Sequence, residues 1–373
     1  MTEYSIRPWA EAAATWSTEW LALGRELQLN PTLLPEWTGV IVETLTEPAS
    51  VQVLVASEGG RLDGIVPFRV RTDAVGPFRV RILEPVSSIL AYHAQLPARG
   101  DPTALLRHLA GTHRELGWDV LRMGGVLTDS PTEQAIRAVA QSDGLPLVSF
   151  PGEESPYLAL GLSGEQLVAR RRKRDRYLMR KNAKDFAAEP GAVELWYGMG
   201  GEREVDTDGL LEGMLRIERD SWKAPAGVAI SNDPRETAYY RRLLAQLAAA
   251  GNLRACLMVI DEVPAAYCLC YAWNGTFGCM KSTYREALAR LAVGHCAQNQ
   301  LLIRLADEGG TEFDFLGDSD RYKLAWSPTT RRHANHFLYA PAGRGWWLGT
   351  LQRLRNRFRP AGTPAQAEDE VSR

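Results

Sequence analysis

Apolar and polar residues follow the same order of patterns twice along this chain. In the first half, alternating apolar positions predict a hairpin over residues 51–56 and 65–70, followed by a strand over 78–83. A helix over 103–116 and a buried strand over 118–123 come next. Hairpin, strand, helix and strand in this order form a common α/β module.

The second half repeats this order at similar spacing. Its predicted elements are a hairpin over 254–273, a strand over 277–281, a helix over 296–308 and a strand over 313–316. In each half a glycine ends the helix, and a short apolar strand with an internal aspartate follows, Asp119 or Asp314. We interpret the match as a structural duplication; two independent uses of a common module are the alternative.

Helical periodicity also predicts two helices ahead of each hairpin. They span residues 11–29 and 37–45 in the first half, and 205–224 and 235–250 in the second. In the helix over 205–224 the apolar stripe, which ends at Trp222, is expected to face inward. A last strand is expected over 336–339.

A strongly basic helix is expected between the halves. Ser163 can cap it, and the pattern continues to about Ala188, before Pro190-Gly191. Arginines and lysines lie all round it, from Arg170 to Lys184. One interpretation is a solvated connecting helix. The other is a cationic wall for a polyphosphate, such as coenzyme A, a nucleotide-linked substrate or tRNA.

The end of the chain combines tryptophans with arginines. Residues 345–359 hold Trp346, Trp347 and four arginines and no acidic residue. Such a stretch either docks on the core as a helix or contacts a membrane surface peripherally. From Pro360 onward the composition predicts a disordered tail.

Bulk properties narrow the class of protein. The chain has 373 residues, enough for two packed units. Its net charge of −2 argues against a dedicated nucleic-acid binder. No apolar run reaches the roughly 20 residues of a membrane helix. The N-terminus contains acidic residues and its apolar residues do not form a continuous run, so it does not resemble a signal peptide. We expect a cytoplasmic protein.

The cysteines are five and irregularly spaced. Cys268 and Cys270 alternate in a predicted strand and so share a face. A metal site or a disulfide is one interpretation of this pair, and reduced, half-buried thiols of a cytoplasmic protein are the one we prefer. Neither a zinc-ligand pattern nor a Ser-His-Asp signature occurs, and we expect no metal.

Residues 279–326 carry a family resemblance. The matching positions are Lys281, Tyr284, Gly294, Phe313-Asp314-Phe315, Gly317-Asp318 and Tyr322-Lys323. In these positions the sequence resembles the CelD-like branch of the GNAT acyltransferase superfamily, whose members are relatives of the FemAB aminoacyltransferases. The resemblance covers residues 150–330 well and 40–150 weakly.

The resemblance and the duplication together imply a mixed α/β fold. We expect α+β mixed sheets in two tandem GNAT-like halves, of which the second is the more complete. The expected division is a degenerate GNAT-like half over 1–160, a basic connecting helix over 161–190, an acyltransferase half over 191–340, and an amphipathic segment with a disordered tail over 341–373.

A donor-binding loop is expected before the helix of the second half. GNAT enzymes hold the pyrophosphate of acyl-CoA with backbone N–H groups at a helix N-terminus. The corresponding residues are Arg290, Val293, Gly294 and His295. One glycine permits close approach of the backbone, but the full glycine signature of the superfamily is lacking. In the first half the counterpart, residues 99–102, is expected to be structural.

The chemistry is expected just after the last strand of the module. Asp318 would accept the proton of the attacking amine or hold its ammonium, and Lys323 would stabilise the oxyanion or hold a phosphate. Both are expected in an apolar setting; an ion pair between them that fixes the turn is the alternative. Contacts to substrate are assigned to Lys281, Tyr284, Trp222, Asp314 and Tyr322.

Three functions fit these observations. The first is an N-acyltransferase that moves an acyl group from acyl-CoA to an amine of a sugar, amino acid or peptide-like intermediate in polysaccharide or specialised metabolite synthesis. The second is a FemAB-like aminoacyltransferase that uses aminoacyl-tRNA, so that tRNA would be the partner. The third is a catalytically degenerate GNAT scaffold that binds a partner or a membrane surface.

Overall fold

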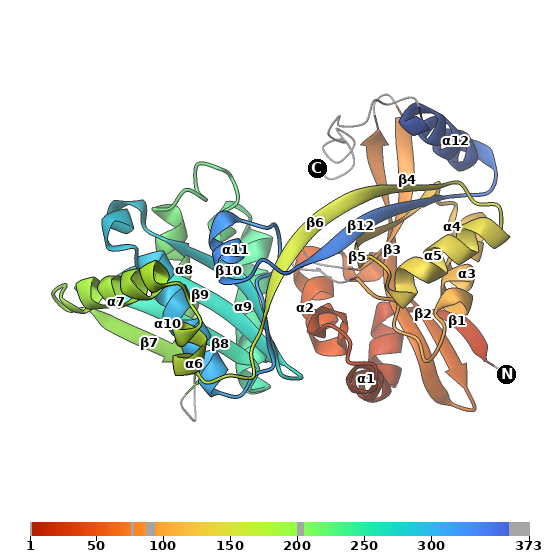
Figure 1. Ribbon diagram of the computed structural model, residues 1–373. Coiled ribbons are helices and arrows are strands. Elements are labelled where there is room, and N and C mark those ends of the chain that lie inside the picture. Colours follow the sequence, from red (N-terminus) through yellow and green to blue (C-terminus); the bar gives the residue numbers. More distant parts are fainter. Residues whose placement is uncertain (1, 76–77, 87–93, 200–204, 358–373) are drawn as a thin grey trace. The chain divides into compact units, whose positions relative to one another are not determined.

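The structure is a computed structural model that describes residues 2–75, 78–86, 94–199 and 205–357 (Figure 1). It divides into two compact units. The first unit is Met1–Glu154 with Arg331–Arg373, and the second unit is Ser155–Thr330. The chain therefore passes between the units twice, at 154/155 and at 330/331.

The first unit is a sheet with helices packed on it. Its strands are β1 (Glu3–Pro8), β2 (Val51–Glu58), β3 (Arg61–Val75), β4 (Phe78–Pro85), β5 (Val120–Leu127), β6 (Leu147–Ala159) and β12 (Thr330–Tyr339). Its helices are α1 (Trp9–Glu26), α2 (Pro35–Leu45), α3 (Thr103–Gly111), α4 (His113–Leu116), α5 (Pro131–Ser142) and α12 (Gly343–Arg357), with the 3-10 turns Pro31–Leu33 and Pro48–Ser50. The strand order is β1-β2-β3-β4-β5-β12-β6.

The second unit has the same kind of layering. Its further strands are β7 (Val193–Tyr197), β8 (Leu253–Ile260), β9 (Val263–Trp273), β10 (Thr276–Tyr284) and β11 (Glu312–Asp314). Its helices are α6 (Gly164–Ala169), α7 (Lys173–Ala187), α8 (Thr207–Arg219), α9 (Pro234–Ala249), α10 (Val293–Asp307) and α11 (Arg321–Trp326), with the 3-10 turns Ile230–Asn232 and Glu286–Leu291. The strand order is β6-β11-β10-β9-β8-β7.

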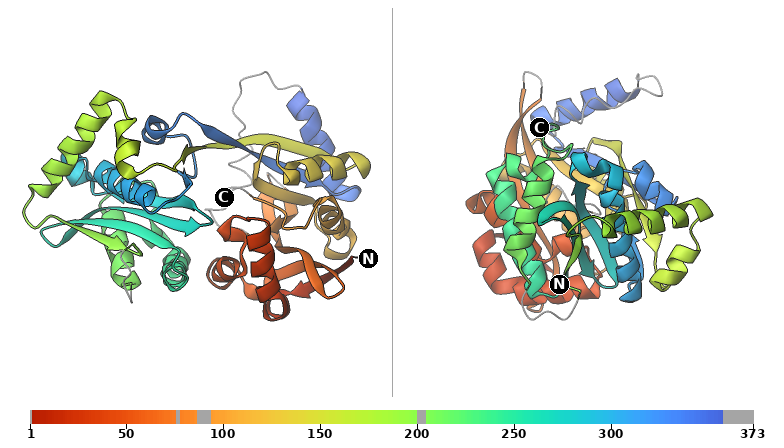
Figure 2. Two further views of the ribbon diagram at one scale, coloured as in Figure 1. Left: turned by 60° about the horizontal axis from the view of Figure 1, so that its bottom comes forward. Right: turned by 90° about the vertical axis from the view of Figure 1, so that its left-hand side faces the viewer.

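Helices cover both faces of the sheet in the second unit (Figure 2). Alternation along β8 directs Cys256 and Met258 into the core beneath α6, α7 and α10. Leu257, between them, packs instead against α8, close to Gly213. Because both faces are covered, β8 and β9 are buried almost along their whole length, which explains their nearly continuous apolar sequence.

The mixed α/β fold predicted from the sequence is confirmed, and so is the repeated order of elements. In both halves two helices precede an antiparallel three-strand run, a helix follows, and the next strand pairs in parallel with the third: β5 with β4, and β11 with β10. The strands β1, β6 and β7 and the helices α5 and α11 were not predicted.

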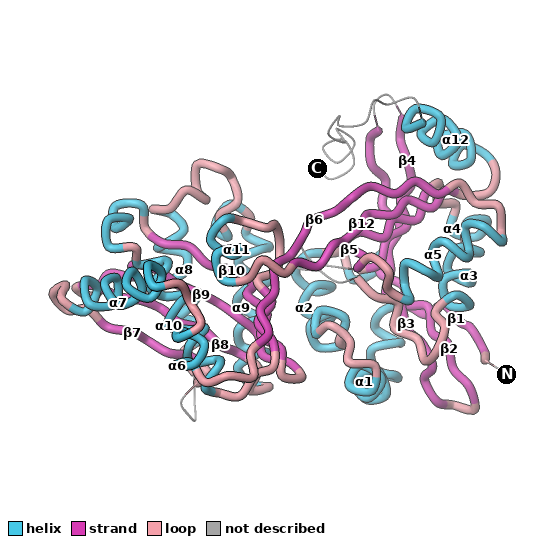
Figure 3. Tube along the Cα trace, in the orientation of Figure 1, coloured by secondary structure: helices cyan, strands magenta, loops and turns pink. Residues whose placement is uncertain are grey.

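The last strand of each half pairs with the sheet of the other half. β6 ends the first sequence repeat, yet residues 157–159 pair with β11. β12 ends the second repeat, yet it pairs with β5 from His333 to Tyr339. Figure 3 shows β6 and β12 as long strands that run next to one another. The strand expected over 336–339 therefore belongs to the first unit, whereas the expected division had assigned it to the second half.

The predicted helix over 163–188 is interrupted, which corrects the sequence analysis. Ser163 caps α6 in a full capping box with Gln166. The helix stops at Arg170 and α7 begins only at Lys173. The guanidinium of Arg171 turns inward, lies 4.2 Å from the ring centroid of Trp326 and donates to the carbonyl of Ala325. This tertiary contact accounts for the break.

The C-terminal helix α12 docks on the first unit. Leu348 packs against a small core cluster, and Arg344 forms an ion pair of 2.6 Å with Asp119. Trp347, Leu351 and Leu354 are exposed. Among the described residues, no helix is long and apolar enough to cross a membrane. The predicted disordered tail from Pro360 lies outside the described residues.

Candidate active site

The parallel strands β10 and β11 of the second unit separate close to the residues that the sequence analysis predicts to be catalytic. β10 pairs with β11 from Thr276↔Glu312 to Gly278↔Asp314. Beyond Gly278, β10 continues to Tyr284 and stays paired with β9, with a bulge between Cys279 and Lys281, whereas β11 ends at Asp314. We call residues 278–284 and 314–318 the fork. Its inner edge offers backbone groups of β10 that β11 does not pair in the part of the chain described.

The helix α10 starts next to the fork and has no side-chain cap. Its N-cap residue is Ala292, with φ of 49°. The first amide that bonds back into the helix is that of Cys296, to the carbonyl of Ala292. The amides of the first turn, Val293 to His295, are the ones a helix leaves for an anion. The expected donor loop is therefore an uncapped helix N-terminus.

Each expected donor residue lies at this helix start. The side chain of Val293 is fully buried, so only its backbone can serve a ligand. A Cβ on Gly294 would come within 2.7 Å of the ring of Tyr284, which is why only glycine fits there. Arg290 and His295 are exposed; Arg290 lies 4.0 Å from Glu189, and the ring of His295 is 6.4 Å from that of Tyr322.

The turn after β11 separates the two residues expected to do the chemistry. Asp318 is exposed, which corrects the expectation of an apolar setting for its side chain. Lys323 is buried, and its Nζ donates to the carbonyls of Leu316 at 2.7 Å and Asp318 at 2.9 Å. The lysine therefore holds the backbone of this turn, with the carboxylate of Asp320 at 3.6 Å. An ammonium has three N–H donors, so one remains for another acceptor.

Two further predicted residues help to build this turn. Asp314 is buried, and its Oδ1 accepts from the amide of Leu316 at 2.9 Å, so it orients the chain after β11. Tyr322 is half-buried with its ring near His295. Burial raises the pKa of Tyr322, against the effect of a hydrogen bond with Ser282. Its hydroxyl is therefore a protonated donor at neutral pH.

A buried cluster of charges, missed by the sequence analysis, lies on the other face of β10. Glu218, at the end of α8, is completely buried. Its carboxylate accepts from the hydroxyl of Tyr267 at 2.5 Å, from the amide of Ile230 at 2.6 Å and from Lys223 at 3.1 Å. Lys281 of β10 lies 3.6 Å away. We call Glu218, Lys223, Tyr267 and Lys281 the Glu218 cluster.

The Glu218 cluster contains an amine that titrates near neutral pH. Burial lowers the pKa of Lys223 to about 8, and the like charge of Lys281 adds to this effect while Glu218 opposes it. Burial by itself raises the pKa of Glu218, but the charges of Lys223 and Lys281 outweigh burial and lower it. Residues with such perturbed pKa values gather at functional sites.

The remaining substrate residues do not share one face. Lys281 points toward Glu218 and lies 5.2 Å from the ring centroid of Tyr240 on α9. Tyr284 packs instead against Gly294 at the start of α10. Trp222 was expected to face inward; it lies beyond the end of α8 and is 53% exposed, so that expectation is wrong. α8 ends at Arg219 because the chain turns there to bring Lys223 to Glu218.

The counterpart loop of the first unit is occupied by internal contacts. Arg99 donates to both carboxylate oxygens of Glu26, at 2.9 and 2.6 Å. Asp101 accepts from the amide of Thr103 at 2.9 Å. The structural role predicted for residues 99–102 agrees with these bonds.

The basic helix presents cations to solvent. Arg170, Arg172, Lys173, Arg174, Arg180 and Lys184 are exposed, and no ion pair involves them within the described ranges. Tyr177, among them, is also exposed. A groove of about 680 Å³ lies along α6, α7 and α10, with Arg176, Arg180 and Asp307 among its lining residues.

Part of the second unit matches a known protein family. Residues 169–324 match the family model described as the acetyltransferase (GNAT) domain. This segment is a GNAT domain. It contains the fork, the start of α10 and the Glu218 cluster. A comparison with the curated proteins gives no match.

The whole chain is similar in fold to several solved structures. FemX aligns with 94% of this chain and 99% of its own, at 11% identity and a TM-score of 0.57. The C-terminal domain of a putative lysylphosphatidylglycerol synthetase from Agrobacterium fabrum covers 92% and 97%, at 9% identity and 0.54. L-PGS from Bacillus licheniformis covers 91% and 95%, at 12% identity and 0.52. At such identities the likeness concerns the fold alone, and the CelD-like assignment stays a prediction.

Proposed function

We propose that this protein is an N-acyltransferase that moves an acyl group from acyl-CoA to an amine of a sugar, amino acid or peptide-like intermediate. The observation that carries the proposal is the uncapped start of α10 beside the fork, inside a GNAT domain. The amides of residues 293–295 would receive the pyrophosphate, with Arg290 and His295 at its edge. The acyl arm would lie along the unpaired edge of β10.

The cations near the fork suit the charge that develops in acyl transfer. Attack on a thioester carbonyl produces an oxyanion, which preorganised N–H donors stabilise. The third N–H of Lys323 is our candidate donor. Asp318, which is exposed, would hold the incoming ammonium or accept its proton.

The proposal is tested first by ligand binding. Coenzyme A, acetyl-CoA, longer acyl-CoAs and bulk aminoacyl-tRNA are added singly, and the unfolding temperature is recorded. A ligand at about 100 times its Kd stabilises the fold by roughly 2.7 kcal/mol. We expect stabilisation by an acyl-CoA. If no coenzyme A species changes the unfolding temperature, acyl-CoA is not the donor.

The assignment of Lys323 is tested by kinetics. With the acyl-CoA that binds, release of coenzyme A is followed in a panel of amines for the wild type and for Lys323→Met. Lys181→Ala is the matched control, since Lys181 is an exposed lysine of the same unit, paired only with Asp185. We expect kcat to fall at least a hundredfold in the first variant. A normal kcat in Lys323→Met would leave the lysine with its structural role alone.

A second candidate donor is aminoacyl-tRNA, as in the FemAB-like alternative. The exposed cations of α7, interleaved with Tyr177, favour it, because phosphate backbones bind such surfaces. Binding to tRNA should then weaken steeply with salt and depend on Arg174 and Arg180. Acyl-CoA binding with no tRNA binding would remove this candidate.

Peripheral membrane contact through residues 345–359 is a further part of the proposal. Trp347, Leu351 and Leu354 form an exposed apolar stripe on α12, and the same helix is rich in arginine. Sedimentation with anionic vesicles should remove the wild type from solution and leave the variant Trp347→Ser/Leu351→Ser behind. If neither protein sediments, α12 is only a docked helix. We place the protein in the cytoplasm, where acyl-CoA and reduced thiols occur together.

The non-catalytic alternative makes a different prediction. A degenerate GNAT scaffold would bind its partner or a membrane equally well after loss of Asp318 and Lys323. The double alanine variant therefore separates the two: an acyltransferase loses turnover, and a scaffold keeps its function.

A further inference from the structure

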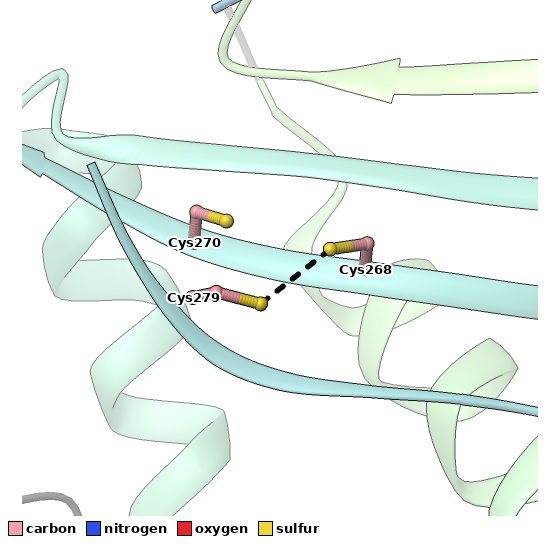
Figure 4. Close-up of side chains that lie close together, drawn as sticks. All are labelled: Cys268, Cys270 and Cys279. Carbon is pink, nitrogen blue, oxygen red and sulfur yellow. Dashed lines mark hydrogen bonds between the residues drawn. The ribbon is translucent and has the colours of Figure 1, made fainter. Parts of the chain in front are cut away.

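Three cysteine thiols meet in the core that the second unit forms with α10. Figure 4 shows them close together on two neighbouring strands. Cys268 and Cys270 point to the same face of β9 because they are two residues apart. Cys279 comes from β10, where its Cα partner is Cys270. A bulge between Cys279 and Lys281 shifts the register, so that Cys268 lies opposite Ser282. The three residues are buried.

The spacing of the sulfurs fits a single soft ion. The three Sγ atoms all lie within 4.8 Å of one another, and those of Cys268 and Cys279 are 3.7 Å apart. Three sulfurs around one ion at metal–sulfur distances of about 2.3 Å lie about 4.0 Å from each other. The largest separation therefore needs to contract by less than an ångström, which small rotations about the Cα–Cβ bonds supply.

Two lysines lie close enough to Cys279 to interact with it electrostatically. The ammonium groups of Lys323 and Lys223 would offset part of the negative charge that three thiolates around one ion would carry. The other two cysteines, Cys256 and Cys296, are buried as well, but neither belongs to the cluster.

We propose that Cys268, Cys270 and Cys279 form a trigonal site for one Cu(I) ion. Soft thiolate ligands select Cu(I), and a structural zinc site almost always has four ligands. Among the described residues, no histidine, aspartate or glutamate joins the three thiols. Binding replaces three S–H protons, which pass to solvent, by one ion, and copper stays at +1 throughout. The ion itself would take no part in the chemistry of acyl transfer.

The position of the site links it to the fork. Cys279 follows Gly278, the last residue of β10 that pairs with β11, and Lys281 of the Glu218 cluster is two residues further on. An ion bound to cysteines of both strands would hold β10 against β9 and so keep this part of β10 separated from β11. Because the thiols are buried, the ion is expected to load slowly into the native protein and quickly during folding.

The test is competition for Cu(I) with a coloured Cu(I) chelator, bathocuproine disulfonate, using the full chain kept reduced and free of oxygen. We expect one Cu(I) per chain, and at least tenfold weaker binding in Cys268→Ser, Cys270→Ser and Cys279→Ser. Cys256→Ser and Cys296→Ser are matched controls, because they remove a buried thiol outside the cluster, and they should keep the wild-type affinity.

X-ray absorption at the copper edge, measured on the wild type alone, keeps the proposal falsifiable if a variant does not fold. We expect three sulfur neighbours and no nitrogen or oxygen neighbour. Two sulfurs, or light-atom ligands, would overturn the proposal. So would unchanged binding in Cys279→Ser, equal loss in the control variants, equally tight binding of Zn(II), or no binding after expression in copper-supplemented medium.

Discussion

Replacing Glu218 by glutamine keeps the shape of the side chain and removes the only negative charge of the Glu218 cluster. Two ammonium groups then remain buried near a neutral amide, Lys223 at 3.1 Å and Lys281 at 3.6 Å in the wild type. Because the pKa of Lys223 is about 8, this lysine can lose its proton in the variant and so avoid being a buried, uncompensated charge at pH 7. Deprotonation at one pH unit below the wild-type pKa costs about 1.4 kcal/mol of folding free energy.

The hydrogen bonds to Glu218 weaken in addition. The hydroxyl of Tyr267 and the amide of Ile230 now donate to a carboxylate, and would donate to a neutral oxygen in the variant. A bond to a charged group is stronger than a neutral one by about 1 kcal/mol. The expected loss of unfolding free energy at pH 7 is therefore about 3–4 kcal/mol, in line with the loss of one partner of a buried ion pair. For a unit of this size the unfolding temperature should fall by roughly 6–16 °C.

The pH dependence gives the sharper test. Below pH 8, Lys223 is charged in the folded and unfolded states alike, and Glu218 compensates its charge. The pKa of Lys223 is about 8 in the folded protein and 10.5 in the unfolded chain, so between these values only the folded protein has lost the proton. The unfolded state then binds more protons, and wild-type stability rises with pH across this window. Because the wild type has by then already lost this charge, the stability lost in Glu218→Gln becomes smaller by about 1.4 kcal/mol. Urea unfolding is measured at pH 7.0 and 9.5, with Glu212→Gln as control, an exposed glutamate of the same helix. A cost below about 1 kcal/mol at pH 7, or the same cost at both pH values, would refute this reasoning.

Three other outcomes are expected. Gly294→Ala should displace Tyr284 and weaken binding of coenzyme A at least tenfold by calorimetry, whereas Gly111→Ala, a helical glycine with open space around it, should leave binding unchanged. Burial lowers the pKa of His336, so the contribution of this histidine to stability is fully present above about pH 6.5 and is lost as the pH falls below that value. His336→Gln should flatten this part of the acid slope in urea unfolding, and an unchanged slope would contradict the assignment. Trp20→Ala removes a fully buried ring whose Nε1 donates to the carbonyl of Leu33 at 2.9 Å, and should cost about 3–5 kcal/mol by denaturant titration; a cost under 1 kcal/mol would mean that the site collapses around the loss.

Elements with a strong local signal could be predicted from the sequence. The hairpin of β8 and β9, the strand β10 and the helix α10 follow apolar periodicity, which depends only on which face of each element is buried. The cap at Ser163 is equally local, since its hydroxyl bonds an amide three residues later. The expected chemistry at residues 318–323 rested on resemblance, and whether these residues catalyse a reaction stays a prediction.

The sequence by itself determined the mixed α/β fold, the duplication and the position of the GNAT module. Periodicity, helix caps and turns each depend on residues that are close together in the sequence, so they can be recognised without the tertiary structure. Only the tertiary structure decided which chemical groups meet. Glu218 and Lys223 lie in one segment, but Tyr267 and Lys281 join them from β9 and β10, and the order of these segments in the chain gives no sign of the contact. Cys279 reaches Cys268 and Cys270 through the register of β9 and β10, and Arg171 breaks the basic helix to stack on Trp326. Such meetings depend on long-range packing, in which each side chain has many partners of similar energy, and local pattern cannot choose among them.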